Sequence, residues 1–257
     1  MAKIDIKRLI LSNGFYIELP SRSPEVEVKY HECDVGYTRS ESVIPDTMNP
    51  QIAYLLGFMR DGSISGSLVE IKQQSSNELL EEVISPIIRE NFNKYVTTKK
   101  GRIIFKDKKI ASFLRNSGNH KKGCWDTPKV IKWCPQEIVK WYIRGFWDAE
   151  GGCPHISNYI YKRKKVPVMI TIVQCWDNIR ECPPLDFIKR NLEELGVGSK
   201  LYPLSKKEVY RKYPRFRLSI TSYRNIILFN DVIGSSHPRK GRDLMILSDS
   251  LRPLVAA

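Results

Sequence analysis

Two carboxylates in this chain stand at matching places in two similar stretches. "YLLGFMRDGS" begins at Tyr54 and contains Asp61, and "YIRGFWDAEGG" begins at Tyr142 and contains Glu150. In both stretches an apolar run with helical spacing is followed by the acid and then by glycine. An acid in the last turn of a helix faces the negative end of the helix dipole, which costs on the order of 0.3–1 kcal/mol. Repetition of an unfavourable placement indicates a chemical role.

The chemistry that suits two such acids is the binding of divalent cations. If the two apolar helices pack side by side, the carboxylates come together, repel each other and are neutralised by a cation between them. Hard oxygen ligands with few other protein groups favour Mg²⁺, with Mn²⁺ or Ca²⁺ able to substitute for binding. A metal held in this way polarises a phosphate and lowers the pKa of a bound water. One acid from each half could then serve one strand of an antiparallel duplex.

The charge of the chain supports a polyanionic substrate. The 257 residues carry 42 Lys and Arg against 28 Asp and Glu, a net charge of +14, which favours nucleic acid as the partner. A merely basic protein without such a partner is the alternative.

The six cysteines do not suggest a zinc site. No pair of them has the two-to-four-residue spacing of a zinc knuckle, which argues against a zinc-dependent enzyme. His31 and Cys33 could share a metal, but burial is the stronger interpretation for one such pair. We expect reduced, mostly buried thiols.

The sequence also bears on the location of the protein. No apolar run reaches the roughly 18 residues needed to span a membrane. The N-terminal stretch has scattered charges and lacks the apolar core of a signal peptide. We therefore expect an intracellular protein of the cytoplasm or nucleoid, with an organelle as the other option and no membrane partner.

The two acid-containing stretches open two repeats. Each repeat reads as helix, strands, helix, strand and helix, because apolar residues recur at helical spacing in some segments and at every second position in others. The strand segments "SLVEIKQQ" and "VPVMITIVQ" both place a glutamine at the end of the apolar row. The predicted divisions are a β-rich extension at 1–46, repeat 1 at 47–123, a linker at 124–133 and repeat 2 at 134–257.

These features resemble the paired motifs of the LAGLIDADG homing endonucleases, in the single-chain form that carries two copies. The resemblance covers the chain from about Asn49 to about Lys240, and the segment from Gly145 to Gly151 has the family's spacing between glycine and acid. It implies an α+β fold of two pseudo-symmetric αββαββα repeats, with a saddle of antiparallel sheets and the motif helices packed at the pseudo-dyad. It also implies a monomer that makes Mg²⁺-dependent double-strand breaks in DNA at a long target site, as in intron homing.

The first motif departs from the family pattern. Gly57 and Asp61 are one residue closer together than Gly145 and Glu150. If the acids are matched, Leu56 takes the place of the packing glycine. If the glycines are matched, the acid moves about 100° around the helix. A tightened helix end and a less close crossing of the helices are the two ways to accommodate the difference.

The resemblance also suggests supporting residues near the metals. Gln73 and Gln174, at the ends of the first strands, are expected close to the acids, and polar residues that only mark a strand end are the alternative. Lys106, at the end of "RIIFK", is a candidate for the basic residue near the scissile phosphate. It could equally be a surface lysine, and its counterpart in repeat 2, near Thr221, is not basic.

Strand alternation predicts the DNA-binding surface. In "YPRFRLSITS" the apolar residues should face the core and the residues between them should face DNA. A β-ribbon fits the major groove, where arginine can contact guanine, and an ordinary solvent face is the alternative. The candidates are Glu70, Lys72 and Gln74 in repeat 1, Arg215, Arg217, Ser219 and Thr221 in repeat 2, and Lys162, Arg163, Lys164 and Lys165 in a basic hairpin loop suited to phosphate. "NHKKG" and "HPRKG" are further candidates for contacts with the DNA backbone.

Two functions are compatible with these patterns. The first hypothesis is a site-specific endonuclease that cuts both strands of DNA. The second is a catalytically silent nucleic-acid binder on the same fold, such as an intron RNA maturase. An acid is present in both motifs, which favours the endonuclease.

Overall fold

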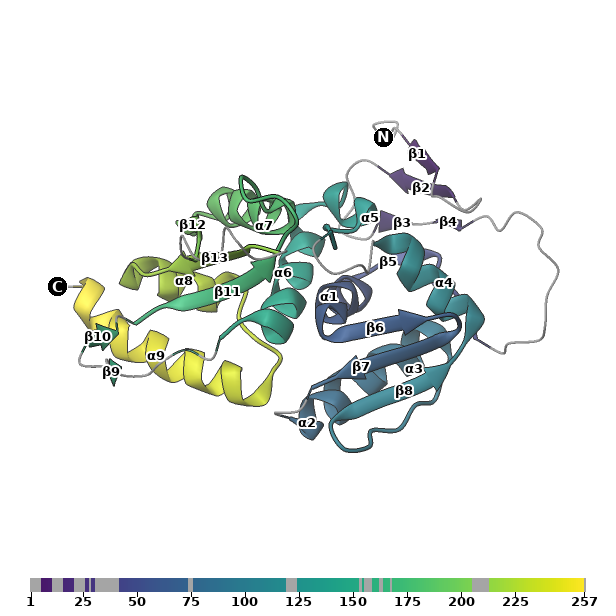
Figure 1. Cartoon of the computed structure of the whole chain (residues 1–257), viewed down its shortest axis with the longest axis horizontal. Coiled ribbons are helices and arrows are strands. Elements are labelled where there is room, and N and C mark those ends of the chain that lie inside the picture. The colour runs from purple at the N-terminus through teal and green to yellow at the C-terminus, as the bar shows by residue number, and fades with distance from the viewer. Residues whose placement is uncertain are drawn as a thin grey trace. The chain divides into compact units, whose positions relative to one another are not determined.

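The chain divides into two compact units. The first comprises residues 1–120 and 127–142 and the second residues 121–126 and 143–257, so the division falls within helix α6 (Gln136–Glu150). Figure 1 traces the chain through both. The computed structural model describes the backbone of 6–10, 16–20, 26–27, 29–30, 159–161 and 164–166, and residues 42–73, 76–118, 124–152, 154, 168–204 and 213–256.

Short strands occupy the N-terminal part of the first unit. In sequence order they are β1 (Ile6–Ile10), β2 (Tyr16–Pro20), β3 (Val26–Glu27), β4 (Lys29–Tyr30) and β5 (Thr47–Met48). β1, β2 and β4 form one antiparallel sheet, and β3 pairs with β5. β1 to β4 lie within the predicted β-rich extension at 1–46. Because β5 directly precedes the first motif, the pairing of β3 with β5 joins the extension to repeat 1.

Repeat 1 begins with the helix predicted for the first motif, α1 (Pro50–Phe58). The Asn49 side chain accepts a hydrogen bond from the Ile52 amide at 2.9 Å, as an N-cap does, and Pro50 is the first helical residue. Both features are typical of a helix N-terminus. The elements that follow are η1 (Met59–Asp61), β6 (Gly62–Ser65), β7 (Leu68–Lys72), α2 (Asn77–Leu79), η2 (Leu80–Ile84), α3 (Ser85–Phe92), β8 (Arg102–Lys106) and α4 (Lys108–Ser117).

The sheet of repeat 1 is antiparallel in the order β6-β7-β8 (Figure 1). Val69 and Ile71 on β7 are buried, as are Ile103 and Phe105 on β8, while the residues between them are partly or fully exposed. This alternation gives the sheet one apolar face for the core, and α4 contacts β7. The opposite face is open and carries the charged side chains.

The second pair of strands in repeat 1 is uneven. The strand before β8 is represented by an isolated bridge between Thr98 and Ile103. Lys99 and Arg102 exchange backbone hydrogen bonds of 2.8 and 3.1 Å around a two-residue turn. The φ angles of Lys100 and Gly101 are 50° and 69°, as a tight hairpin turn requires. The hairpin is therefore present although its first arm is only a bridge.

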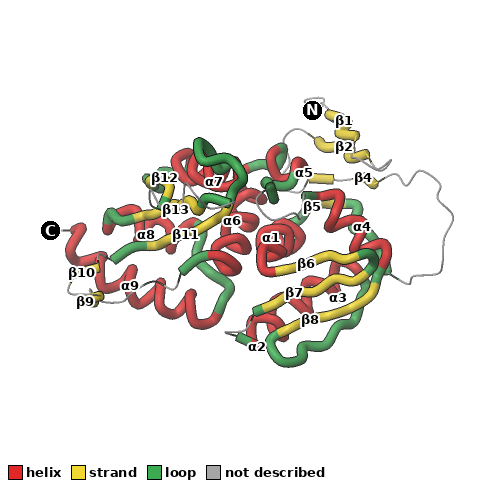
Figure 2. The backbone as a smooth tube through the Cα atoms, viewed as in Figure 1, coloured by secondary structure: helices red, strands yellow, loops and turns green. Residues whose placement is uncertain are grey.

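Repeat 2 is built on a second antiparallel sheet, in the order β11-β13-β12 (Figure 2). An isolated bridge between Gly151 and Ile172 lies beside β11. It takes the position that β6 has beside β7 in repeat 1. Helix α7 contacts β12 and β13. The elements are α5 (Lys129–Lys132), α6, β9 (Tyr159–Tyr161), β10 (Lys164–Val166), β11 (Ile170–Cys175), α7 (Pro183–Glu194), β12 (Lys200–Pro203), β13 (Arg215–Ile220), α8 (Tyr223–Val232) and α9 (Pro238–Ala256).

The two sheets follow one plan. Repeat 1 reads β6, β7, β8 and the Thr98 bridge across the sheet, and repeat 2 reads the Gly151 bridge, β11, β13 and β12. In repeat 1 the strand β7 pairs with the last strand, β8, and in repeat 2 the strand β11 pairs with the last strand, β13. The predicted α+β class, with an antiparallel sheet in each repeat, is confirmed.

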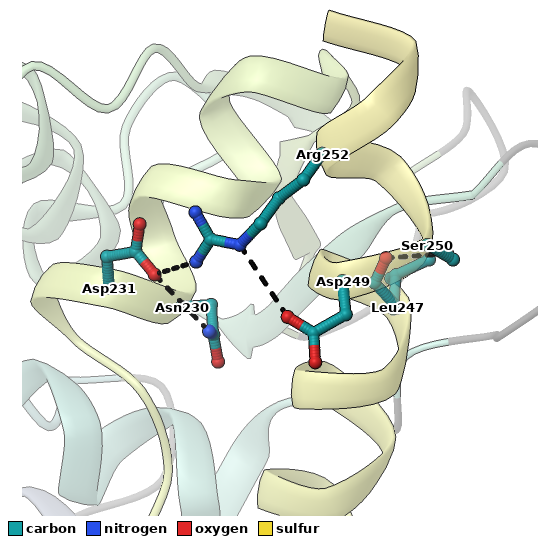
Figure 3. A network of polar contacts seen from close by, with 6 residues as sticks. All are labelled: Asn230, Asp231, Leu247, Asp249, Ser250 and Arg252. Carbon is teal, nitrogen blue, oxygen red and sulfur yellow. Dashed lines mark hydrogen bonds and ion pairs between the residues drawn. The ribbon is translucent and has the colours of Figure 1, made fainter. Parts of the chain in front are cut away.

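Helices α8 and α9 contact each other along the second unit. Figure 3 shows Arg252 of α9 donating to the Asp231 carboxylate at 2.6 Å, with its Nε 3.6 Å from Asp249. Ion pairs this exposed add little to stability. Neither α9 nor any other described helix is long and apolar enough to cross a membrane.

The cysteines are less buried than predicted. Of those in the described part of the chain, Cys182 is buried, whereas Cys124, Cys134 and Cys175 are half-buried, and none of these four forms a disulfide. Burial raises the pKa of the Cys134 thiol to about 12, so this thiol stays protonated and unreactive at neutral pH. His31 and Cys33 lie outside the described residues.

Candidate functional site at the ends of the motif helices

The first motif ends in a tightened turn. α1 gives way at Met59 to η1, a 3₁₀ turn that ends at Asp61. The ψ angles of Phe58 and Met59 are −24° and −6°, against about −42° in an α-helix. The Gly62 amide closes the turn by donating to the Met59 carbonyl, three residues earlier.

The second motif ends as an ordinary α-helix. α6 continues to Glu150, and the Gly151 amide donates to the Trp147 carbonyl, four residues earlier, at 2.7 Å. Met59 and Trp147 therefore hold corresponding places, since each accepts the hydrogen bond that closes the motif. Gly57 and Gly145, which stand two residues before Met59 and Trp147, therefore also occupy corresponding positions.

Tightening compensates for the missing residue. A 3₁₀ helix rises about 2.0 Å and turns about 120° per residue, against about 1.5 Å and 100° in an α-helix. From Gly57 to Asp61 this gives a rise of about 7.5 Å, equal to the five α-helical steps from Gly145 to Glu150. It also recovers about 60° of the missing 100° of rotation. The prediction of a tightened helix end is confirmed.

The motif acids also have equivalent places relative to the sheets. In repeat 1 Gly62 pairs with Ile71, and Gln73 follows two residues later. In repeat 2 Gly151 pairs with Ile172, and Gln174 follows two residues later. In each unit, therefore, the acid and the glutamine lie at the same end of the sheet. Gln73 is buried at 8% exposure and Gln174 is half-buried.

Close packing requires the glycine that follows each acid. A Cβ at Gly151 would lie 2.1 Å from Cδ1 of Trp147 and 2.5 Å from its carbonyl oxygen. A Cβ at Gly62 would lie 2.6 Å from Cε of Met59 and 3.0 Å from its carbonyl oxygen. The methionine chain end can move aside, whereas the indole and the backbone cannot. Asp61 and Glu150, which precede these glycines, are both half-buried. Each therefore contacts both protein and solvent.

Lys106 lies at the far end of the repeat 1 sheet from Asp61. It is exposed and pairs with Leu68, three positions and about 10 Å along β7 from Ile71. The register therefore does not bring Lys106 beside the acid. The basic residue at the acid's end of β8 is Arg102, which pairs with Lys72. Sequence reasoning missed Arg102, although the alternation in "RIIFK" places it on the same face as Lys106.

Glu70 is held by neighbours on the open face of the same sheet. Its carboxylate oxygens lie 3.0 Å from Lys72 Nζ and 3.3 Å from an Arg102 guanidinium nitrogen, and the Ser63 hydroxyl donates to it at 3.3 Å. The hydrogen bond from Lys72 is the largest influence and lowers the pKa of the Glu70 carboxyl. Glu70 therefore stays ionised and orders the two cations beside it.

Alternation in β13 is as predicted for the core face. Phe216, Leu218 and Ile220 are buried. Arg215 and Arg217 are half-buried on the other face, and Thr221, just beyond the strand, is exposed.

Ser219 is an exception to the predicted exposure. It is only 3% exposed, so its predicted place on an accessible surface is wrong. β13 is the central strand, and Ser219 is flanked by Thr171 on β11 and Lys200 on β12. A small side chain between two cross-strand neighbours is readily covered by them. The exposed polar residue of this row is Lys200.

Arg217 corresponds to Arg102 by register. In repeat 1, Gly62 pairs with Ile71, which pairs with Ile103, and Arg102 stands one residue before Ile103. In repeat 2, Gly151 pairs with Ile172, which pairs with Leu218, and Arg217 stands one residue before Leu218. Arg217 is flanked by Val173 and by Tyr202, which is 38% exposed. The Arg217 Nε atom is buried without a hydrogen-bond partner in the described structure, while the residue as a whole is half-buried.

The remaining DNA-binding candidates lie partly outside the described residues. Gln74, Lys162 and Arg163 are outside them. Lys164 and Lys165 belong to β10, which pairs with β9 as the predicted hairpin, and only their backbone is described. These residues stay predictions.

Comparison with known proteins places the chain in a family. A family model described as a LAGLIDADG-like domain matches residues 137–234. The homing endonuclease I-ApeI of Aeropyrum pernix is 31% identical over 206 residues, which is 74% of this chain and 84% of that protein. The chain belongs to the LAGLIDADG family of homing endonucleases.

Solved structures of a LAGLIDADG enzyme share the fold. I-DmoI in complex with DNA and Mn superposes with a TM-score of 0.50 and 18% identity, over 72% of this chain and 96% of that one. A double variant of I-DmoI, bound to target DNA nicked in the coding strand, gives 0.50 and 20%, over 72% and 94%. At these identities the likeness concerns the fold, and it agrees with the two antiparallel sheets.

The LAGLIDADG acids come with donors that suit a hard cation. In each unit a half-buried carboxylate and a glutamine amide lie at one end of the sheet. Within the described ranges, no group of three or more His, Cys, Asp or Glu is placed to hold a metal. Few oxygen ligands, completed by water and substrate phosphate, are characteristic of Mg²⁺ sites in proteins. The residues present therefore fit Mg²⁺ or Mn²⁺ and do not fit zinc.

A buried network behind the second LAGLIDADG motif was missed by sequence reasoning. Asp148 is fully buried and accepts hydrogen bonds from the Ser235 hydroxyl and, at 2.9 Å, from the Ser236 amide. Lys240 is 5% exposed and donates to the carbonyls of Trp147 and Asp148. The prediction that "HPRKG" contacts the DNA backbone is therefore wrong for this lysine, because its ammonium is enclosed within the unit.

His237 begins helix α9 in the same network. The Lys240 amide approaches its Nδ1 at 3.5 Å. Burial, and then the nearby charge of Lys240, lowers the pKa of His237 from its ordinary 6.5 to about 4. The imidazole is therefore neutral at physiological pH, which leaves Nδ1 free of a proton to accept from the helix.

Substituting the two motif glycines should have unequal effects. We expect Gly151→Ala to destabilise the protein by about 1–3 kcal/mol because its Cβ meets an indole and a carbonyl that cannot move. Gly62→Ala should cost less, because Met59 can adjust. Thermal unfolding of the two variants checks this order, and equal or reversed losses would contradict the packing described.

His237 should make the protein acid-sensitive. Its folded pKa is lowered, so the unfolded chain binds the proton more readily and stability falls as pH drops from 6.5 towards about 4. His237→Asn, which keeps an acceptor but does not titrate, should flatten this dependence. Urea unfolding at about pH 7 and about pH 5 measures it. An unchanged slope in the variant would show that other groups dominate.

Proposed function

We propose that this chain is a site-specific DNA endonuclease that cuts both strands of a long target by divalent-metal-dependent phosphodiester hydrolysis. The observation that carries the proposal is the acid–glycine–glutamine placement, which recurs in the same sheet register in both units. Its relative I-ApeI is a homing endonuclease, and the net charge of +14 suits a polyanionic substrate.

Each repeat supplies one acid to the reaction. Asp61 and Glu150 would each bind a divalent cation, with Gln73 and Gln174 as the respective oxygen donors nearby and Mg²⁺ as the physiological ion. A divalent cation held there would supply Lewis-acid chemistry at the scissile phosphate and at a bound water. I-DmoI was crystallised with DNA and Mn, which is consistent with an ion of this kind. Both acids are half-buried, so each carboxylate keeps some access to solvent for a cation.

The open faces of the two sheets are the proposed DNA-binding surface. These faces present cations along their strands, namely Lys72 and Arg102 in repeat 1 and Arg217 and Lys200 in repeat 2. A β-ribbon of this kind can enter the major groove. Glu70 holds Arg102 and Lys72 before DNA arrives, which reduces the side-chain entropy lost on binding. A single chain carries both motifs, so we propose that it acts as a monomer.

Removing either acid should abolish cutting without abolishing binding. We expect Asp61→Asn and Glu150→Gln each to lower the cleavage rate at least about 100-fold, a loss of about 2.7 kcal/mol of transition-state stabilisation. The substrate is a duplex that carries the uninterrupted insertion site of the chain's own gene, with Mg²⁺ or Mn²⁺, and both strands are followed separately. Affinity for the same duplex in Ca²⁺ serves as the control.

The outcomes separate the two hypotheses. Undiminished cleavage by either variant would refute the assigned acids. Binding by the unaltered protein without cleavage in Mg²⁺ and Mn²⁺ would instead favour a silent binder, such as an RNA maturase, and affinity for the intron RNA would then be measured.

Arg217 should contribute to recognition of the target. We expect Arg217→Met to weaken binding by about 1–3 kcal/mol and to relax selectivity at one position of the target. Lys189→Met removes one positive charge from α7, where Lys189 pairs with Glu193 at 2.7 Å, and is the matched control. Binding to a set of single-position target variants measures both effects. Equal losses in the two variants would show that Arg217 acts only through net charge.

A further inference from the structure

Lys240 is a buried cation at the carboxyl end of the second motif helix. Its Nζ lies 2.7 Å from the Asp148 carbonyl oxygen and 3.1 Å from that of Trp147. It also lies 5.7 Å from the centre of the Trp147 ring. The residue is 5% exposed, so the ammonium has exchanged most of its hydration for these carbonyls and the indole face.

The contacts meet a specific need of this helix end. The last carbonyls of an α-helix have no partner within the helix and form the negative end of its dipole. Glu150, the last residue of α6, adds a full negative charge at the same place. A cation bound to the carbonyls of the two residues before Ala149 offsets that charge and holds the final turn against fraying.

The segment that carries Lys240 is itself fixed to the motif helix. The Asp148 carboxylate accepts from the Ser235 hydroxyl and from the Ser236 amide at 2.9 Å. Ser235 in turn accepts from the His237 amide at 3.1 Å, immediately before α9. The start of α9 and the end of α6 are therefore joined by contacts in both directions, so Lys240 cannot move without disturbing the last turn of the motif.

The first motif closes its helix in a different way. Its last turn is the 3₁₀ turn completed by the Gly62 amide. The buried cation next to that acid is Arg60, which extends to the Tyr142 hydroxyl at 3.4 Å. The described contacts at the ends of the two motif helices therefore differ.

We propose that Lys240 is a positioning residue for Glu150, and that it supports hydrolysis of one DNA strand more than the other. This inference rests on the proposed function. Lys240 touches neither the reacting phosphate nor the metal. It acts through the carbonyls of α6, which set where the Glu150 carboxylate stands.

Lys240→Met is the test variant, since methionine fills similar space without the charge or the donors. We expect single-turnover cleavage of one strand in Mg²⁺ to slow at least about 5-fold more than cleavage of the other, as losses of supporting contacts around metal ligands do. Lys240→Arg, which keeps the charge and donors, should restore part of the rate. Arg242→Met is the matched control on α9, because Arg242 is exposed and pairs only loosely with Asp243 at 3.7 Å.

A second measurement needs neither metal nor DNA. Hydrogen exchange of the Gly151 amide, which bonds to the Trp147 carbonyl, should be at least about 10-fold faster in Lys240→Met, because the local opening of the last turn becomes easier. Exchange of the Gly62 amide in the first motif should be unchanged.

Each outcome either supports or overturns the inference about Lys240. Strand-selective slowing together with faster Gly151 exchange supports the inference. Wild-type rates on both strands, equal slowing of both strands, or unchanged Gly151 exchange would overturn it. If the unaltered protein cuts no DNA, the proposed function fails, and that result is distinguished from failure of the inference by the unaltered protein's own cleavage assay.

Discussion

The passage from each motif helix into its sheet is the constraint on which both repeats depend. The acid is the last helical residue, and the next residue already pairs with an isoleucine of β7 or β11. Glycine is needed there because the helix closes onto it, through Met59 in one motif and Trp147 in the other. The carboxylate is thus held within one residue of a fixed sheet register, at the end of the helix where its charge is least favoured.

The two motifs satisfy this constraint with different local structures. In the first, a 3₁₀ turn reaches the axial rise of the longer α-helical motif with one residue fewer. In the second, the full α-helical turn is retained, and Lys240 from α9 binds its last carbonyls. A backbone requirement can be met by either solution, which explains how the two repeats tolerate such different sequences around the motif acid.

The positive charge of the chain has more than one use. Lys240 is enclosed against helix carbonyls, and Arg60 is buried beside Tyr142. Arg102 and Arg217, by contrast, occupy register-equivalent places on the open faces of the two sheets. A net charge of +14 therefore points to a polyanion, but it does not say which cations meet it. Local organisation by Glu70 shows that an acid on the same face can order the cations instead of opposing them.

Local signals in the sequence were sufficient for the motif helices, the strands that follow them and the core-facing rows of β7 and β13. These features depend on periodicity and capping within a few residues, which a single chain displays directly. The burial of Ser219, the distance of Lys106 from Asp61 and the enclosure of Lys240 were not predictable in this way. Each depends on which strand or helix lies alongside, and such pairings join residues as far apart as Asp148 and Lys240. The one-residue shortening was visible in the sequence, but its resolution required the backbone geometry of the folded turn.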